Sequence, residues 1–415
     1  MRILIVSQYY WPESFIINEL SLTLARQGHQ VTVATGKPNY PGGDIFEGYC
    51  ASGVQEERYY DLINVIRVPV YPRGSGGGRK IVLNYLSFIF MGLWYFPQKL
   101  KGKDIDVILV FAPSPILQAI PAIFLKWVKR AHLAIWVQDL WPQSLKATGF
   151  IRNRFALRAV GLLVRCIYSF ANTLLVQSQA FISAVGDYAR RDKIIYYPNS
   201  YQDSSLQPSI TTQIPTDLLA LLEGYFCLVF AGNLGKAQSV DTLMQTAEYL
   251  KHLPNCKLVL VGSGSMTGWL EEQKVIRGLD NLILAGRFPA EEMPQFFSRA
   301  AGLLVTLKQE QIFAYTIPSK IQAYLAAGRP ILAALDGEGA RVVEEAGAGL
   351  TSPAEDAVGL ALRIEQLYRM SPAERDELGR AGRRYYFEHF EMNLQCLRLA
   401  DILKSRMKEA GAKEK

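Results

Sequence analysis

A lysine occupies an unusual position in the stretch TIPSKIQAYLAAGRPIL, residues 316–332. Ser319, directly after Pro318, is typical of a helix N-cap, and Gly328 before a proline is typical of a helix end. Lys320 would then lie in the first helical turn, where the helix dipole disfavours a cation. An anion held between Lys320 and the free amides would reverse this effect. The alternative is a solvated lysine that costs a few tenths of a kcal/mol.

Two other segments of the second half could complete an anion site. FAGNLGKAQS (230–239) predicts a strand that ends in a glycine turn before a helix, which leaves backbone amides open to an anion. LAGRFPAEEM (284–293) follows another strand, and its turn could offer backbone groups to a planar base. The combination of three such turns favours an anion site over a solvated Lys320.

Three other motifs are weaker. Asp104 and Asp106 look like a carboxylate pair for Mg²⁺, but they precede their strand, whereas open parallel sheets bind ligands at the carboxyl ends of strands. VGSGS (261–265) follows a strand, yet G-x-G alone is as often a plain turn. The first strand is followed by QYYWPE and not by the glycine fingerprint of a dinucleotide dehydrogenase, which excludes that class.

Short β-branched apolar runs alternate with longer helical patterns along the whole chain. Such runs, separated by helices, predict parallel sheets covered on both faces, and the pattern occurs twice. We therefore expect two doubly wound α/β domains, joined by the polar segment 200–217. The runs are RILIVS, QVTVAT, NVIRVP, VILVFA, LAIWVQ, TLLVQS and IIYYPN, then FCLVFAG, KLVLVG, LILAG, GLLVTL and PILAAL.

Composition and charge narrow the class of protein. The 415 residues are 49% hydrophobic, which indicates globular domains, and the five cysteines form no C-x-x-C pair, which favours a reduced, cytoplasmic protein without a zinc site. The apolar run at the N-terminus is too short for a signal peptide. Residues 1–200 hold 22 Lys and Arg against 12 Asp and Glu, whereas the remainder holds 23 against 26. The basic half shows no nucleic-acid motif, so an anionic membrane surface is the favoured partner.

The segment IVLNYLSFIFMGLWYFP (81–97) supports a membrane partner. Its aromatic residues and bordering cations suit a helix at the interface of an anionic membrane, although Asn84 lies inside it. Arg154, Arg158 and Arg165 add cations at helical spacing. The alternative is an internal helix buried against the first sheet.

Four segments of the second half resemble the retaining family-4 glycosyltransferases of the GT-B fold: GNLGKAQ, GRFPAEEM, TIPSKIQAYLAAGRPI and DGEGARVVEEAGAGL. The resemblance is greatest to the branch that builds O-antigen, capsule and related surface polysaccharides, including fucosamine transferases. Four segments of the first half resemble the same branch: QYYWPE, GHQVTVATGKPNYPGG, VQDLWPQSLKATG and YYPNS. The resemblance therefore covers nearly the whole chain.

The resemblance implies two Rossmann-like domains that face each other across a cleft. Residues 1–200 would bind the acceptor, with a C-terminal helix at about 390–410 packed back on them, and residues 218–385 would bind a nucleotide sugar. The donor would be UDP-linked, possibly an N-acetylated amino sugar. The implied donor-binding residues are Gly232, Asn233, Lys236, Gln238, Gly286, Arg287, Phe288, Pro318, Ser319 and Lys320.

The chain departs from the family pattern at the donor site. Asn233 and Gln238 stand where many members carry arginine and lysine. The usual pair of glutamates would fall at Tyr315 and Ala323, neither of which is acidic. Glu310 lies close to the first glutamate when counted from the strand GLLVTL, so a longer loop could carry that role, and the ribose-binding glutamate has no clear successor.

Expected catalytic residues are Lys320, Glu310 and Asp139. Lys320 and Lys236, with amides near Gly232 and Ser319, would stabilise the departing nucleoside diphosphate without a metal or other cofactor. Asp139, at the end of a strand, could orient the acceptor hydroxyl or the donor sugar, or could instead be the N-cap of the following segment. Glu13 and Trp141 are the expected acceptor contacts.

The resulting hypothesis is a retaining glycosyltransferase that acts on a polyprenyl-diphosphate-linked saccharide. It would work on the cytoplasmic face of the inner membrane, attached to the membrane surface, with no nucleic acid involved. The alternative is a GT-B-shaped nucleotide-sugar epimerase or a non-catalytic binding subunit, which the missing glutamates leave open.

Overall fold

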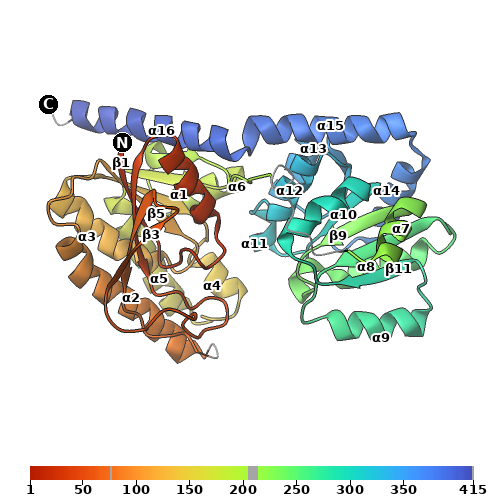
Figure 1. Ribbon diagram of the computed structural model, residues 1–415, viewed down its shortest axis with the longest axis horizontal. Coiled ribbons are helices and arrows are strands. Elements are labelled where there is room, and N and C mark those ends of the chain that lie inside the picture. Colours follow the sequence, from red (N-terminus) through yellow and green to blue (C-terminus); the bar gives the residue numbers. More distant parts are fainter. Residues whose placement is uncertain (75–76, 204–213, 414–415) are drawn as a thin grey trace. The chain divides into compact units, whose positions relative to one another are not determined.

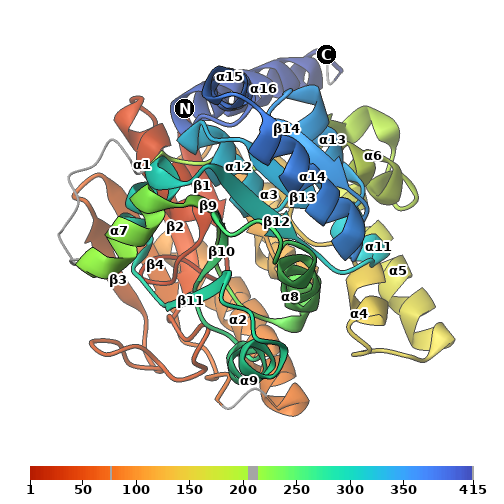
Figure 2. The ribbon, with the colours of Figure 1, turned by 90° about the vertical axis from the view of Figure 1, so that its right-hand side faces the viewer.

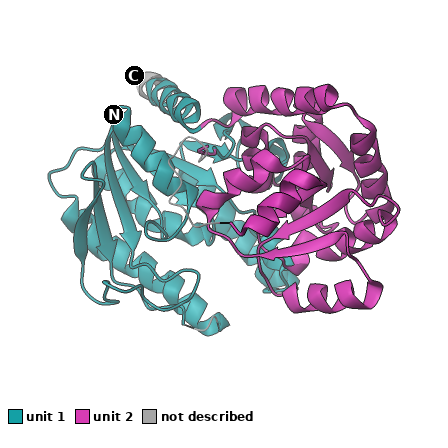
Figure 3. Cartoon of the chain, turned by 45° about the vertical axis from the view of Figure 1, so that its right-hand side comes forward, with its two compact units in different colours: residues 1–200, 392–415 teal, residues 201–391 magenta. Residues whose placement is uncertain are grey.

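The computed structural model describes residues 1–74, 77–203 and 214–413 and divides into two compact units. Unit 1 comprises Met1–Ser200 and Met392–Lys415, and unit 2 comprises Tyr201–Glu391 (Figure 3). The expected junction at 200–217 lies mostly outside the described residues.

Unit 1 contains an eight-stranded sheet with the order β3-β4-β2-β1-β5-β6-β7-β8. All neighbouring strands are parallel except β3 and β4. Every residue of β5 and β6 is buried, because helices cover both faces of a parallel sheet. The strands are β1 (Arg2–Val6), β2 (Gln30–Gly36), β3 (Gln55–Tyr59), β4 (Ile63–Val68), β5 (Val107–Ala112), β6 (His132–Val137), β7 (Thr173–Val176) and β8 (Ile194–Tyr196).

The helices of unit 1 cover both faces of this sheet (Figure 1). On one face, α1 (Ile16–Arg26) packs with α16 (Met392–Lys413), so the end of the chain belongs to the core of unit 1. Elsewhere in the unit, α2 (Gly78–Lys99) contacts α3 (Ala119–Lys129), which contacts α5 (Arg154–Phe170). The shorter helices are α4 (Gln143–Ala147) and α6 (Gln179–Gly186), and the short 3₁₀ turns are η1 (Ile116–Gln118) and η2 (Arg191–Lys193).

Unit 2 contains a six-stranded, fully parallel sheet with the order β11-β10-β9-β12-β13-β14. Side chains alternate between two cores along β9, where Cys227 and Val229 join one and Leu228 and Phe230 join the other. The strands are β9 (Phe226–Ala231), β10 (Cys256–Val261), β11 (Leu282–Gly286), β12 (Gly302–Thr306), β13 (Ile331–Ala334) and β14 (Gly349–Ser352).

Helices cover both faces of the second sheet as well. One face carries α8 (Val240–Tyr249) and α14 (Ala357–Arg369), which contact each other (Figure 2), together with α9 (Thr267–Arg277). The other face carries α7 (Thr216–Gly224), α10 (Met293–Arg299), α12 (Ser319–Ala327), α13 (Glu338–Glu345) and α15 (Pro372–His389). The remaining short elements are α11 (Gln311–Ala314), η4 (Lys236–Gln238) and η5 (Ala290–Glu292).

The predicted doubly wound architecture is confirmed in both units. The twelve apolar runs named above form β1, β2 and β4–β13. The sequence did not predict β3 and β14. Polar, partly exposed residues make up most of β3, QEERY, and β14 is the short segment GLTS, so neither shows the apolar pattern of a buried strand.

Candidate active site

The strand order of unit 2 reverses between β9 and β12, and open α/β sheets bind ligands at the carboxyl ends of strands beside such a reversal. Three glycines with positive φ lie at this edge: Gly232 after β9 (136°), Gly262 after β10 (145°) and Gly286 at the end of β11 (81°). Residues with a Cβ atom rarely adopt these backbone conformations, so the three turns depend on glycine.

The three glycine turns contact one another through their backbones. The amide of Gly262 donates to the carbonyl of Gly286 at 2.7 Å, and the amide of Gly232 donates to that of Val261 at 2.8 Å. A Cβ atom on Gly262 would stand 1.8 Å from the carbonyl oxygen of Gly232. The turn VGSGS, a weak motif by itself, is therefore part of the same edge.

The helix that carries Lys320, α12, begins one residue earlier than the sequence predicted. Pro318 is the N-cap of α12, and Ser319 is its first helical residue and makes no capping bond, so the prediction of Ser319 as N-cap is wrong. Proline suits this boundary because its missing N–H would be unsatisfied there in any case. Gly328 ends the helix with φ of 65°, as predicted.

Lys320 projects from α12 to the end of β9. Its ammonium lies 3.7 Å from the ring centroid of Phe230 and donates to Oε1 of Gln238. A Cβ atom on Gly232 would stand 2.7 Å from Cε of Lys320, so the glycine leaves room for this side chain. Burial lowers the pKa of Lys320 to about 7, and no carboxylate pairs with it among the described residues. The cation therefore lacks a counter-charge among the residues of unit 2 that the structure describes.

Gln238 lies directly at the strand reversal. The hydroxyl of Thr306, at the end of β12, donates to the backbone carbonyl of Gln238, and the amide of Lys308 donates to that of Ala237 at 3.1 Å. Unit 2 thus brings together Gly232 directly after β9, Gln238 of η4 and Lys320 of α12.

The other expected donor contacts surround this group. Asn233, Lys236 and Arg287 are exposed, and Phe288 instead packs on Phe296 with ring centroids 4.9 Å apart. Glu310 is exposed just before α11, and its side chain makes no capping bond.

Glu13 has a structural environment in unit 1. It is 2% exposed, and its carboxylate accepts bonds from the amides of Tyr10 (3.0 Å), Asn39 (2.9 Å) and Tyr40 (2.8 Å). Burial raises the pKa of Glu13 to about 7, against the lowering effect of these bonds. Since its oxygens are used by the loops after β1 and β2, Glu13 fixes those loops to each other.

Asp139 follows β6 at the ligand edge of unit 1, and Trp141 donates from Nε1 to its carboxylate at 3.2 Å. Burial raises the pKa of Asp139. The N-cap of α4 is Pro142 and not Asp139, so the capping alternative does not hold.

The sequence missed a buried polar network beside this edge. Asn84 on α2 is fully buried, accepts from Nε2 of Gln8 at 2.7 Å and donates to the carbonyl of Tyr71 at 2.7 Å. The amide of Gln8 in turn donates to Gln118 Oε1 at 2.8 Å. An asparagine within an apolar run was the signal that could have revealed this network.

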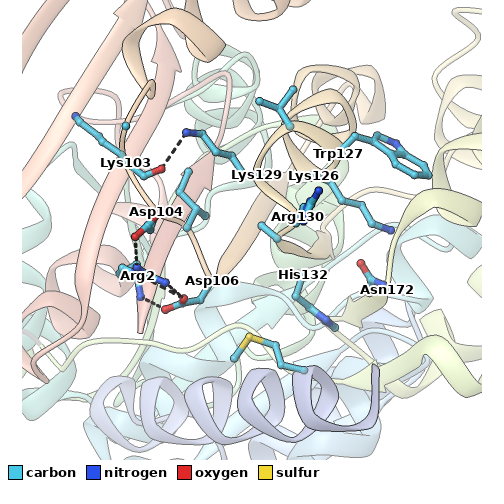
Figure 4. A pocket seen from close by; sticks show the side chains of 15 residues that line it. Arg2, Lys103, Asp104, Asp106, Lys126, Trp127, Lys129, Arg130, His132 and Asn172 are labelled. Carbon is cyan, nitrogen blue, oxygen red and sulfur yellow. Dashed lines mark hydrogen bonds and ion pairs between the residues drawn. The ribbon is translucent and has the colours of Figure 1, made fainter. Parts of the chain in front are cut away.

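A cavity of about 1010 Å³ lies at the opposite, amino edge of the unit 1 sheet (Figure 4). Arg2 there bonds both Asp104 (2.8 Å) and Asp106 (2.6 Å), and Lys129 donates to the backbone carbonyl of Lys103 at 2.9 Å. The aspartate pair therefore neutralises an arginine. Within the described parts of the chain, no group of three or more His, Cys, Asp or Glu side chains is placed to hold a metal ion.

Comparison with known proteins relates both units to sugar transfer. Residues 15–200 match the family described as glycosyl transferase 4-like domain, and residues 226–370 match glycosyl transferases group 1. The chain is 24% identical over 308 residues to the probable glycosyltransferase WbjE of Pseudomonas aeruginosa, covering 72% of this chain and 74% of that protein.

Two further similarities agree with this relation. The putative colanic acid biosynthesis glycosyl transferase WcaI of Escherichia coli is 23% identical over 345 residues, covering 79% of this chain and 82% of that protein. The crystal structure of HepE from Anabaena in complex with UDP superposes with a TM-score of 0.70 at 15% identity, covering 98% of this chain and 100% of that chain. A glycosyltransferase 4-like domain in the first half and a group 1 domain in the second, each doubly wound, place the chain among the glycosyltransferases of the GT-B fold.

Proposed function

We propose that the chain transfers a sugar, with retention, from a UDP sugar to a polyprenyl-diphosphate-linked saccharide in bacterial surface polysaccharide synthesis. The observation that carries the proposal is the ammonium of Lys320, which has no carboxylate partner among the described residues and lies beside the glycine turns at the strand reversal of unit 2. Burial disfavours the charged form of this lysine, and a diphosphate bound there would supply the negative charge that stabilises it.

The same geometry suits departure of a nucleoside diphosphate. Negative charge builds on the diphosphate as the glycosidic bond breaks, and a fixed cation with oriented amides stabilises that charge. We assign this role to Lys320, to the amides near Gly232 and to the first amides of α12, which lack intrahelical acceptors. Lys236 is exposed nearby in sequence and would add a second cation.

The base and the sugar would contact the surrounding turns. We propose that Gly286, Arg287 and Phe288 form the turn that receives the base and that Glu310 contacts the donor sugar. The UDP found in the HepE structure supports a uridine nucleotide. The names of WbjE and WcaI support a transferase over an epimerase or a binding subunit, and the name of WcaI supports polysaccharide synthesis.

In unit 1 we propose that Asp139 orients the acceptor hydroxyl and that Trp141 holds the carboxylate of Asp139 in place. Glu13 would contribute to the acceptor site indirectly, through the loops it joins.

A lipid-linked acceptor requires access to a membrane, and α2 offers a surface for it. This helix has the length and composition to cross a bilayer, and no other helix in the described ranges does. However, Phe88 and Phe96 are fully buried in unit 1, whereas Phe90 and Trp94 on the other side are 63% and 66% exposed. This division favours a helix that lies in the membrane interface, with the protein on the cytoplasmic face.

The neighbouring helix extends this apolar surface. Phe124 and Trp127 of α3 are 44% and 65% exposed, and α3 contacts both α2 and α5. Arg154, Arg158 and Arg165 of α5 would add attraction to anionic lipid, worth about 1 kcal/mol for each cation at the surface.

Titration with UDP tests the donor site. We expect Lys320→Ala to weaken UDP binding about 10- to 100-fold, the loss of a charge-assisted hydrogen bond, with the thermal melt retained. Lys274→Ala, on α9, is the matched control, because the Lys274 side chain forms no hydrogen bond or ion pair with the described residues. An unchanged dissociation constant for UDP in Lys320→Ala would remove this residue from the site and, with it, the main support for the proposal.

A further inference from the structure

A second cation that forms no ion pair with the described residues lies at the ligand edge of unit 1. Arg73 follows β4, and its guanidinium stands over three tyrosine rings, at 5.8 Å from the centroid of Tyr9, 5.2 Å from Tyr40 and 5.8 Å from Tyr85. Its Nη1 donates to the hydroxyl of Tyr9 at 3.1 Å. We call these four residues the Arg73 cluster.

The tyrosines come from three separate segments. Tyr9 follows β1, Tyr40 follows β2 and Tyr85 lies on α2, so the cluster forms only when the sheet and helix have assembled. Phe15 fixes two of the rings, with centroids 5.3 Å from Tyr9 and 5.4 Å from Tyr40. A guanidinium held over aromatic faces is stabilised by cation–π attraction, which orients it without neutralising its charge.

The charge of Arg73 is not neutralised by a carboxylate. No ion pair of Arg73 occurs in residues 1–74, 77–203 and 214–413, and the oxygens of nearby Glu13 are used by three backbone amides. Arg67, six residues earlier on β4, shows the usual arrangement: it is fully buried and bonds Glu57 at 2.5 Å. Because an arginine has five donors and Tyr9 uses one, Arg73 keeps donors for a ligand.

The cluster is close to the residue that we assign to the acceptor. Burial raises the pKa of Tyr85; the charge of Arg73 opposes this rise, and the charge of Asp139 adds to it. The cation and Asp139 thus flank the same ring at the carboxyl edge of the sheet.

We propose that the Arg73 cluster binds the phosphate group of the acceptor, the diphosphate that joins its saccharide to the lipid. A planar guanidinium recognises phosphate oxygens in pairs, and the tyrosine hydroxyls add donors. The same helix then serves both parts of the acceptor: Tyr85 lies on its inner side, and Phe90 and Trp94 are exposed on its outer side. This inference rests on the lipid-linked acceptor of the proposed function.

The test compares ligands and variants by calorimetric titration of the full chain. The ligands are farnesyl diphosphate, farnesol, inorganic pyrophosphate and UDP. We expect Arg73→Gln to weaken farnesyl diphosphate binding about 10- to 100-fold and Arg73→Lys to weaken it less, since lysine keeps the charge but loses the planar fork. Arg58→Gln is the matched control, because Arg58 is exposed on β3 of the same unit and its side chain, within the described part of the chain, bonds only the backbone of Asp61.

The outcomes separate the two proposals. Loss of farnesyl diphosphate binding in Arg73→Gln with unchanged UDP binding supports the inference. It is overturned if farnesol binds the wild type as tightly as its diphosphate, if pyrophosphate alone binds as tightly as farnesyl diphosphate, or if Arg73→Gln behaves like Arg58→Gln. An equal loss of UDP binding would assign Arg73 to the donor and overturn it as well. Failure of the proposed donor site would appear independently, as absence of UDP binding in the wild type.

Discussion

Both units have a doubly wound sheet, but the carboxyl edges of the two sheets carry different kinds of residue. In unit 2, glycines after β9 and β10 and at the end of β11 bring bare backbone to the edge, beside one lysine. In unit 1, the corresponding edge carries large side chains, among them the Arg73 cluster and the buried network of Gln8 and Asn84.

This difference fits two kinds of ligand. Backbone amides and a lysine recognise a compact charge that is the same in every nucleoside diphosphate. Large polar and aromatic side chains recognise a shape, and they can vary with the acceptor while the sheet beneath them stays unchanged. Three predictions test this difference between the units.

The largest effect should come from adding one methyl group to the edge of unit 2. We expect Gly262→Ala to weaken UDP binding by at least about 100-fold, because its Cβ atom would meet the carbonyl of Gly232 and displace both turns. Gly268→Ala is the control, since a Cβ atom there has no neighbour within 4 Å and the residue lies in α9. Calorimetric titration with UDP measures both, and equal affinities for the two variants would show that the edge does not depend on backbone approach.

The second prediction separates the outer surfaces of the two units. We expect the double variant Phe90→Ser, Trp94→Ser to lower partitioning onto vesicles containing anionic lipid about 10- to 100-fold with an unchanged melt, because both side chains are exposed. Val275→Ser, Ile276→Ser is the matched control in unit 2, where these residues are 80% and 67% exposed.

Phe88 belongs to a different class from its neighbours on α2. It is fully buried, so Phe88→Ser should destabilise unit 1 by about 3–5 kcal/mol and does not test the membrane. Sedimentation with vesicles and a thermal melt distinguish the cases. If the double variant and the control in unit 2 sediment alike, the assignment of α2 to the membrane interface is wrong.

The third prediction concerns pH and distinguishes lysine from arginine. In the free protein burial lowers the pKa of Lys320 to about 7, and a bound diphosphate raises it by favouring the charged form. UDP affinity should therefore be greatest near pH 7 and fall by up to about tenfold for each pH unit above it.

Binding of farnesyl diphosphate should stay nearly constant between about pH 7 and pH 9, because arginine stays fully charged and the phosphate is already ionised throughout this interval. Titration of both ligands at several pH values measures the contrast. A UDP affinity that is independent of pH over this interval would show that Lys320 does not change its charge at the donor site.

The amino-acid sequence was enough to predict the doubly wound architecture of both units. Twelve apolar runs predicted twelve strands, because residues buried on both faces of a parallel sheet must be apolar whatever surrounds them. The candidate donor turns were also visible, because each follows its own strand directly and glycine marks it locally. Lys320 could be predicted to bind an anion for a similarly local reason, because it is a cation at the start of a helix.

Which of these residues contact one another depends on the tertiary structure. In the sequence, Gly262 belongs to an ordinary glycine turn. It becomes part of the candidate donor site because β10 lies beside β9. Three backbone amides from two loops bond the carboxylate of Glu13, and the Arg73 cluster joins residues that are far apart along the chain. The physical reason is that local patterns report burial and backbone conformation, whereas the partners of a charged side chain depend on which strands the fold makes neighbours.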